Sequence, residues 1–170
     1  VVFWAHNGSG YDFQFVLNWM LFNSKLCEGT TPEITNRGSK LLQVRLHAKT
    51  FDIVFRDTLC FFQFGLDSFP KAFGFDKTED FKELRKGHFP HFFDPEDEDR
   101  DFYVGPYPLL EDYGADNMAP DKRSQLLDWL HEKHLRKETF YFSQEKEDYL
   151  YADVAVLAAA ITSFRQTFCN

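Results

Sequence analysis

The spacing of apolar residues predicts a strand, a helix and a hairpin in the first third of the chain. Residues 1–5 form a short β-prone run, and the glycine-rich segment 6–10 after it indicates a turn. Residues 12–22 carry apolar side chains at helical spacing, whereas 41–46 and 51–55 resemble the two strands of a hairpin. We expect residues 1–5 to form an inner strand, because they are apolar on both faces, and the hairpin to extend from the sheet.

The rest of the chain is predicted to be irregular in its middle and helical at its end. Residues 125–134 fit a short helix, and residues 145–168 fit a long one with charges first and a broad apolar face after them. Glycine, proline and clustered charges indicate irregular structure at residues 23–39, 94–101 and 106–114, and short helical segments after a strand end at 57–74. The element order predicts a mixed α/β domain with the last helix packed on the sheet.

Composition supports a folded domain and excludes one class of nucleic-acid-binding protein. The chain has 170 residues, of which 44% are hydrophobic and 21 are Phe, so it is long and apolar enough to form a core. Its formal net charge of −8 argues against a protein that coats nucleic acid through a basic face. It is compatible with a nuclease that binds a strand end through metal ions, since such sites need clustered carboxylates.

The cysteines and the apolar runs bear on where the chain resides. Cys27, Cys60 and Cys169 fit neither a zinc site nor a disulfide framework, so we expect reduced thiols and an intracellular protein, in nucleus, cytoplasm or mitochondrion. No signal peptide or membrane-spanning run is visible, so no membrane partner is expected. The chain opens on an apolar run without Met, which is typical of a fragment.

Four short segments combine residue types that could carry chemistry. Asn7-Gly8-Ser9-Gly10-Tyr11-Asp12 joins a strand end to a helix, although helix capping alone would explain Asp12. Tyr149 and Asp153 are four residues apart in the long helix and so share a face, although a solvated carboxylate would explain Asp153. Thr58-Leu59-Cys60-Phe61-Phe62 and Lys86-Gly87-His88-Phe89, taken singly, fit a turn hydroxyl and a surface charge.

Together, in order and separation, these segments resemble the 3′–5′ exonuclease domain of protein-primed family B DNA polymerases. AHNGSGYDFQF resembles the motif N-x(2,3)-[FY]-D, and YLYAD resembles Y-x3-D. TLCFF and KGHF are similar to the elements [ST]-L-x2-h and K-x2-h of this branch. Two longer segments, RDTLCFFQFGLDSFPKAFG and FPHFFDPEDEDRDFYVGPYPLLEDYGADNM, resemble polymerases of linear plasmids, self-synthesising mobile elements and their viral relatives.

The resemblance implies a fold, a domain boundary and partners. The fold would be RNase H-like (DnaQ-like), a mixed sheet with flanking helices that lacks its first strands. Residues 1–170 would form a partial exonuclease domain, with an irregular insertion at about residues 90–120 and without the polymerase domain. The partners would be the 3′ end of single-stranded DNA, the polymerase domain of the same parent chain and a terminal priming protein.

The resemblance also implies roles for individual residues. Asp12 and Asp153 would hold two Mg²⁺ or Mn²⁺ ions, Tyr149 would orient the attacking water, and Lys86 would steady charge at the scissile phosphate. A further set would hold the frayed 3′ end, and it comprises Asn7, Tyr11, Phe15, Thr58, Leu59, Phe62 and Phe89.

One motif of the family is missing, which leaves two other functions open. The family carries D-x-E upstream of N-x3-Y-D, and the D-x-E in this chain, Asp94-Pro95-Glu96, is a poor substitute in an acidic loop. We therefore expect little exonuclease activity from the isolated chain. The first alternative is an inactive module that grips single-stranded DNA or braces a polymerase. The second is a small α/β scaffold with no nucleic-acid role.

Overall fold

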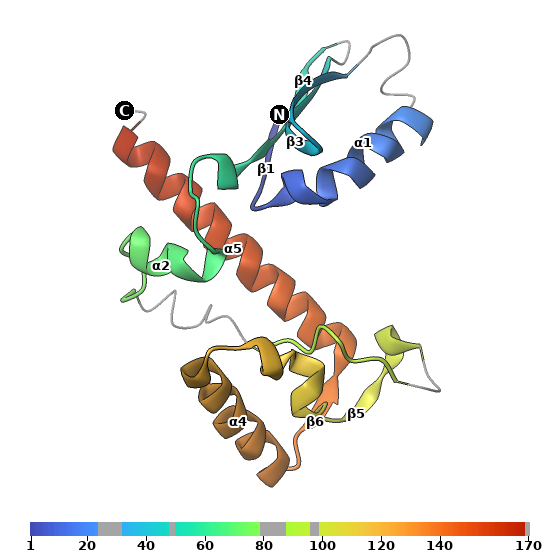
Figure 1. The fold of residues 1–170 in the computed structure, drawn as a ribbon, viewed down its shortest axis with the longest axis vertical. Coiled ribbons are helices and arrows are strands. Elements are labelled where there is room, and N and C mark those ends of the chain that lie inside the picture. Colours follow the sequence, from blue (N-terminus) through green and yellow to red (C-terminus); the bar gives the residue numbers. More distant parts are fainter. Residues whose placement is uncertain (24–31, 48–49, 79–87, 96–98, 169–170) are drawn as a thin grey trace. The chain divides into compact units, whose positions relative to one another are not determined.

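The computed structural model describes residues 1–23, 32–47, 50–78, 88–95 and 99–168 (Figure 1). They belong to two compact units, Val1–Phe69 and Pro70–Asn170, and each unit is described by itself. Within the described ranges, no helix combines the length and the apolar character that crossing a bilayer requires.

The first unit is a four-stranded mixed sheet with one long helix. The strands lie in the order β1-β4-β3-β2, with β1 parallel to β4 and the other pairs antiparallel. The elements are β1 (Val2–Ala5), α1 (Asp12–Asn23), β2 (Glu33–Arg37), β3 (Lys40–His47) and β4 (Asp52–Asp57). This arrangement confirms the predicted helix and hairpin.

Helix α1 and one face of the sheet form the core of this unit. Val44 and Leu46 alternate along β3 and are 1% and 2% exposed. Phe13 of α1 is buried as well, and its ring meets the ring of Phe55 edge-on with centroids 6.0 Å apart. Alternation in the strand thus directs one set of side chains against the helix.

Three expectations for this unit were wrong. Strand β1 lies at an edge of the described sheet rather than inside it, because only β4 among the described strands pairs with it, and Val2 and Phe3 are about half exposed. The hairpin strands β3 and β4 form the middle of the sheet rather than an extension from it. The segment expected to be a loop contains β2, whose residues are all exposed and therefore show no alternation to detect.

Among its described residues, the second unit combines a two-stranded sheet with two long helices. Strands β5 (Val104–Pro106) and β6 (Thr139–Tyr141) pair antiparallel, and the helices are α4 (Pro120–Leu135) and α5 (Phe142–Phe168). The short helix α2 (Phe69–Ala72) begins at the boundary of the units. The predicted helices are confirmed, but α4 starts earlier, with Pro120 in its first turn, where a missing N–H costs nothing. Strands of three residues are too short to leave a periodic signal.

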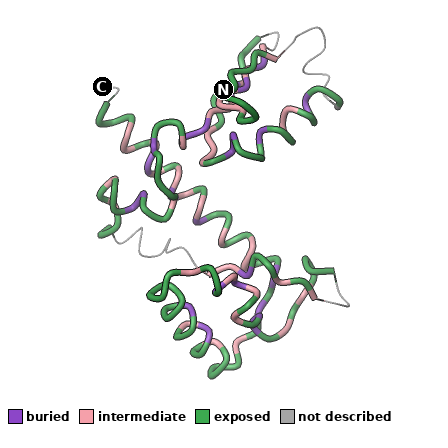
Figure 2. Tube along the Cα trace, in the orientation of Figure 1, coloured by how far each residue is buried: buried purple, intermediate pink, exposed green. Residues whose placement is uncertain are grey.

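An aromatic core holds this unit together. Its buried members come from residues 107–115, from α4, from β6 and from the first residue of α5, and they are Tyr107, Tyr113, Ala115, Leu126, Leu130, Phe140 and Phe142. Figure 2 colours the buried positions purple along the chain. The ring of Phe140 contacts the ring of Tyr107 edge-on at 5.1 Å. Residues 106–114 therefore lack long elements but are packed into the core.

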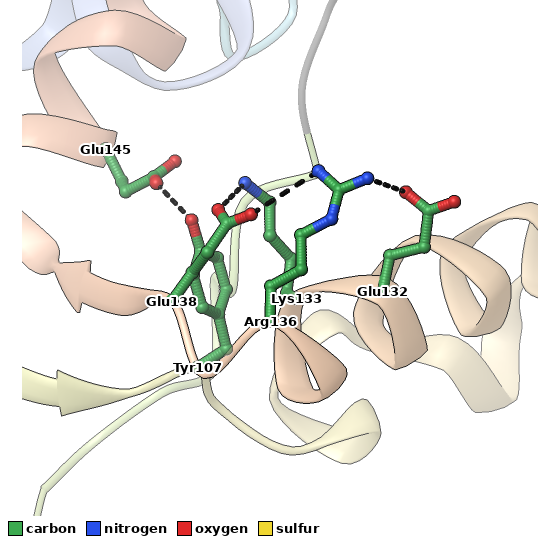
Figure 3. Close-up of polar contacts among 6 residues, drawn as sticks. All are labelled: Tyr107, Glu132, Lys133, Arg136, Glu138 and Glu145. Carbon is green, nitrogen blue, oxygen red and sulfur yellow. Dashed lines mark hydrogen bonds and ion pairs between the residues drawn. The ribbon is translucent and has the colours of Figure 1, made fainter.

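A group of ion pairs lies at the end of α4 (Figure 3). Lys133 and Arg136, near the end of α4, form ion pairs with Glu138, and Arg136 also pairs with Glu132. The hydrogen bond from Lys133 holds the pKa of the Glu138 carboxyl below its usual value. These ion pairs link the end of α4 to Glu138, just before β6.

We predict that replacing one core ring destabilises the protein, while replacing an exposed ring does not. Phe140 is 1% exposed and Phe102 is 80% exposed. Phe140→Ala should lower the free energy of unfolding by about 3–5 kcal/mol, because it removes buried ring contacts and leaves a cavity. Phe102→Ala should change it by less than about 0.5 kcal/mol. Urea unfolding followed by circular dichroism measures both, and equal effects would contradict the assignment of the core.

Candidate functional site

The carboxylate of Asp57 fixes the turn between β1 and α1. This side chain is 1% exposed at the end of β4, and it accepts N–H bonds from Asn7 (2.9 Å), Ser9 (2.9 Å) and Leu59 (2.8 Å). Asn7 has φ 66°, in the left-handed region that asparagine tolerates better than most residues. The turn thus reaches from the end of β1 to the end of β4, which lie side by side in the parallel pair.

Hydrogen bonds keep this buried carboxylate ionised. Burial by itself raises the pKa of Asp57, but the Ser9 side chain and the backbone N–H groups of Leu59, Ser9 and Asn7 outweigh burial and hold the pKa below its usual value. Charge-assisted bonds of this kind are stronger than bonds between neutral groups. The turn is therefore held by an anion at its centre.

Gly8 allows the turn to lie close to the helix and the strand. A Cβ atom at this position would come within 2.8 Å of both the Ala5 Cβ and the Phe13 ring. Both neighbours are fixed, Ala5 by strand pairing and Phe13 by burial, so a larger residue would displace the turn.

Thr58 faces inward and is fully bonded. Its hydroxyl is buried, donates to the carbonyl of Ala5 at 3.0 Å, and accepts from Nδ1 of His6 at 3.0 Å. The His6 ring in turn lies edge-on to Phe69, with centroids 4.8 Å apart. These bonds fit a role for Thr58 in positioning the turn, and its predicted contact with DNA stays a prediction.

The same turn presents exposed aromatic and acidic side chains. Tyr11 is 68% exposed, Phe15 is 57% exposed, and their rings meet edge-on at 4.7 Å. Asp12 is exposed in the first turn of α1. Phe62, which was expected to grip DNA with them, is instead 9% exposed and lies edge-on to Phe69 at 5.6 Å, while Leu59 is half-buried.

The second group of candidate residues lies in the second unit. Tyr149 and Asp153 are one turn apart on α5 and are half-buried. The ring of Phe89 stacks on the ring of Tyr149, with centroids 5.2 Å apart and planes 28° apart. The ring of His91 meets Tyr149 edge-on at 5.4 Å. The element KGHF is thus joined to YLYAD through Phe89, while Lys86 lies outside the described residues.

The two groups belong to different units, so the predicted proximity of Asp12 and Asp153 stays a prediction. The predicted groove of Thr58, Leu59, Phe62 and Lys86 stays one as well. Within the described ranges, no three His, Cys, Asp or Glu side chains are grouped so that they would hold a metal ion.

Sequence reasoning missed Asp57, His6 and His91. Asp57 directly precedes the element TLCFF and ends a strand, so a carboxylate at that place was visible in the sequence. Its role, however, depends on the parallel pairing that places it opposite Ala5. His6 and His91 each lie beside a recognised motif, but their contacts with Thr58 and Tyr149 are made through space.

Comparison with known proteins gives the class. The whole chain, residues 1–170, matches the family described as DNA polymerase type B, organellar and viral, and the chain belongs to that family. No curated protein and no solved structure matches it. The family B resemblance is thereby confirmed, DNA replication is the process in which the chain belongs, and DNA is its partner. Type B polymerases use divalent metal ions, for which carboxylates are suitable ligands.

We predict that Asp57→Asn loosens the turn and removes a pH dependence. The amide should lower the free energy of unfolding by on the order of 2–4 kcal/mol, because it leaves buried N–H groups unpaired. The folded-state pKa of Asp57 lies below its unfolded value. The stabilisation is therefore complete above an unfolded pKa of about 3.9, and it is lost as the pH falls through the folded pKa.

Urea unfolding between pH 2 and pH 7 tests this, with Asp128→Asn, an exposed position on α4, as the control. The wild type and the control should lose stability together toward low pH, and Asp57→Asn should lose less. Parallel pH profiles for all three proteins would contradict the assigned role.

Proposed function

We propose that the chain is part of the 3′–5′ proofreading exonuclease of a protein-primed type B DNA polymerase, with an RNase H-like fold. The observation that supports this most directly is that the first unit carries Asp12 and the second carries Tyr149 and Asp153, the residues of two motifs of the family. Asp12 follows a turn locked by Asp57, and Tyr149 and Asp153 share one face of α5. The proposal is that Asp12 and Asp153 face one cleft.

The first unit would bind the end of the strand. Tyr11 and Phe15 offer exposed rings on which bases stack without regard to sequence, as proofreading requires. Because Asp57 fixes the backbone of the turn before them, the chain that carries these rings is ordered before DNA arrives, which lowers the entropy lost on binding. A mispaired end is the easier one to unpair, and this difference supplies selectivity.

The second unit would supply the group beside the reacting phosphate. The oxygen ligands of Asp12 and Asp153 suit Mg²⁺ or Mn²⁺, which when bound activate water and neutralise charge on the phosphate. Tyr149, one turn from Asp153, would orient the water through its hydroxyl. Lys86 would add positive charge near the scissile phosphate, as the resemblance of KGHF to the K-x2-h element implies.

The described sheet leaves a place for further carboxylates. One side of β1 pairs with β4, and no described strand lies on its other side. A strand that carries D-x-E would extend the sheet there, next to the turn that ends in Asp12. Such a strand would bring the acidic ligands that a two-metal site needs beyond Asp12 and Asp153.

A second candidate function is a module that grips single-stranded DNA without cleaving it. The exposed pair of Tyr11 and Phe15 favours it, because stacking on these rings needs no metal ion. DNA binding that persists in a chelator therefore distinguishes a binding function from metal-dependent cleavage.

We predict that the chain binds single-stranded DNA through its exposed rings. Tyr11→Ala or Phe15→Ala should weaken binding of a fluorescent oligothymidylate by roughly 1–3 kcal/mol for each stacked base lost. Phe102→Ala, which removes a still more exposed ring in the second unit, is the control. Fluorescence anisotropy in EDTA measures the affinity. If the wild type does not bind, or if all three variants bind equally well, the proposed binding of DNA by Tyr11 and Phe15, on which both candidate functions rest, is contradicted.

We predict that cleavage needs D-x-E together with Asp12 and Asp153. The chain alone should release little nucleotide from a 3′-labelled strand, and a fusion that adds a D-x-E strand before Val1 should release it with Mg²⁺. In the fusion, Asp12→Ala or Asp153→Ala should lower the rate by on the order of 100-fold or more, because the attacking water is then misplaced. Glu147→Ala, which removes an exposed carboxylate on α5, is the control. Cleavage that survives either aspartate substitution would refute the exonuclease proposal.

A further inference from the structure

We propose that Phe89 and His91 are positioning residues that hold the ring of Tyr149 where the exonuclease reaction needs its hydroxyl. The inference rests on the function proposed above, and it assigns to Phe89 a different role from the DNA contact that its motif implied. It also assigns a role to His91, which no motif had marked.

The two rings enclose Tyr149 from different directions. Phe89 covers one face of the tyrosine ring, with centroids 5.2 Å apart and planes 28° apart. His91 meets the same ring nearly perpendicularly, at 5.4 Å and 82°, and it also meets Phe89 at 5.3 Å. Stacked and edge-to-face contacts are the favoured geometries for such rings. The three side chains thus form one aromatic cluster.

The segment that carries Phe89 and His91 is anchored to the core of the unit. Pro90, between them, is fully buried. The N–H of Phe92 donates to the carbonyl of Asp112 at 3.0 Å, and the ring of Phe93 lies edge-on to Tyr103 at 4.7 Å. Residues 89 and 91, which contact Tyr149, are therefore held by core contacts of the residues between and after them.

The helix that carries Tyr149 is fixed to the same core. Glu145, one turn before Tyr149, accepts a hydrogen bond of 2.7 Å from the hydroxyl of Tyr107, which is 5% exposed (Figure 3). At the start of α5 the ring of Phe142 meets the ring of Phe89 at 5.5 Å. Helix α5 and the segment 89–93 both pack against the core of this unit, so Tyr149 and its neighbouring rings are held in one arrangement.

Fixing the ring matters because the reaction depends on where the hydroxyl lies. A tyrosine side chain has two rotatable bonds, and a half-buried ring with open faces would sample several positions. A displacement of about 1 Å in a group that orients a reactant can cost on the order of 100-fold in rate. Contacts on a face and an edge restrict both bonds. The face of Phe89 that stacks on Tyr149 is not open to a base.

The experiment follows Tyr149 directly by fluorine NMR. The chain is labelled with 3-fluorotyrosine, and the Tyr149 resonance is identified by its loss in Tyr149→Phe. Phe89→Leu and His91→Ala should each shift or broaden this resonance, and His91→Phe, which keeps an aromatic edge, should restore it. Phe92→Ala, an exposed ring in the same segment, is the control and should leave it unchanged. His91 is exposed, so His91→Ala is expected to fold.

Cleavage kinetics form the second measurement, made in the fusion that carries D-x-E. Phe89→Leu and His91→Ala should lower kcat by at least about tenfold and leave KM unchanged, because they leave the proposed DNA-binding rings of Tyr11 and Phe15 in place. An unchanged Tyr149 resonance in both variants would overturn the positioning role, whatever the kinetics. A shifted resonance with unchanged kcat would overturn it too. Absence of cleavage in the fusion would instead count against the exonuclease proposal, while the resonance still decides whether the ring is held.

Discussion

The ionised carboxylate of Asp57 is the constraint on which the first candidate half-site depends. A charge buried at a strand end would be costly without partners, and three backbone N–H groups at 2.8–2.9 Å supply them. Two of these donors, Asn7 and Ser9, belong to the turn after β1, and the third belongs to the segment after β4. The left-handed Asn7 and the close approach at Gly8 follow from that arrangement. The backbone at Tyr11 and Asp12 is therefore fixed by the turn that precedes it.

The second unit positions its candidate residues by a different physical interaction. Here aromatic contacts, rather than a buried anion, determine where the candidate groups lie. The core that includes Tyr107 and Phe142 supports the start of α5, and the segment around Pro90 lies against it. Tyr149 and Asp153 therefore project from a helix whose first turns are anchored. Both halves of the proposed site are built on rigid support, as catalytic geometry requires.

Much of the fold was predictable where periodicity was strong. Helices α1 and α5 and the β3–β4 hairpin followed from apolar spacing, but β2 is exposed on both faces and β5 and β6 are too short to show a period. Motif order led to the polymerase family. It did not reveal that Thr58 and Phe62 turn inward, or that Asp57 organises the turn, because those facts depend on parallel pairing and burial between distant segments.

The central claim is that Asp12 and Asp153 hold metal ions in one site, and paramagnetic broadening by Mn²⁺ tests it most directly. With 3-fluorotyrosine in the chain, Tyr11 reports beside Asp12 and Tyr149 reports one turn from Asp153. The account predicts that Mn²⁺ broadens both resonances over the same concentration range, and that Asp12→Ala or Asp153→Ala relieves both together. Broadening of one resonance alone, or broadening of both that neither substitution relieves, would contradict a shared site.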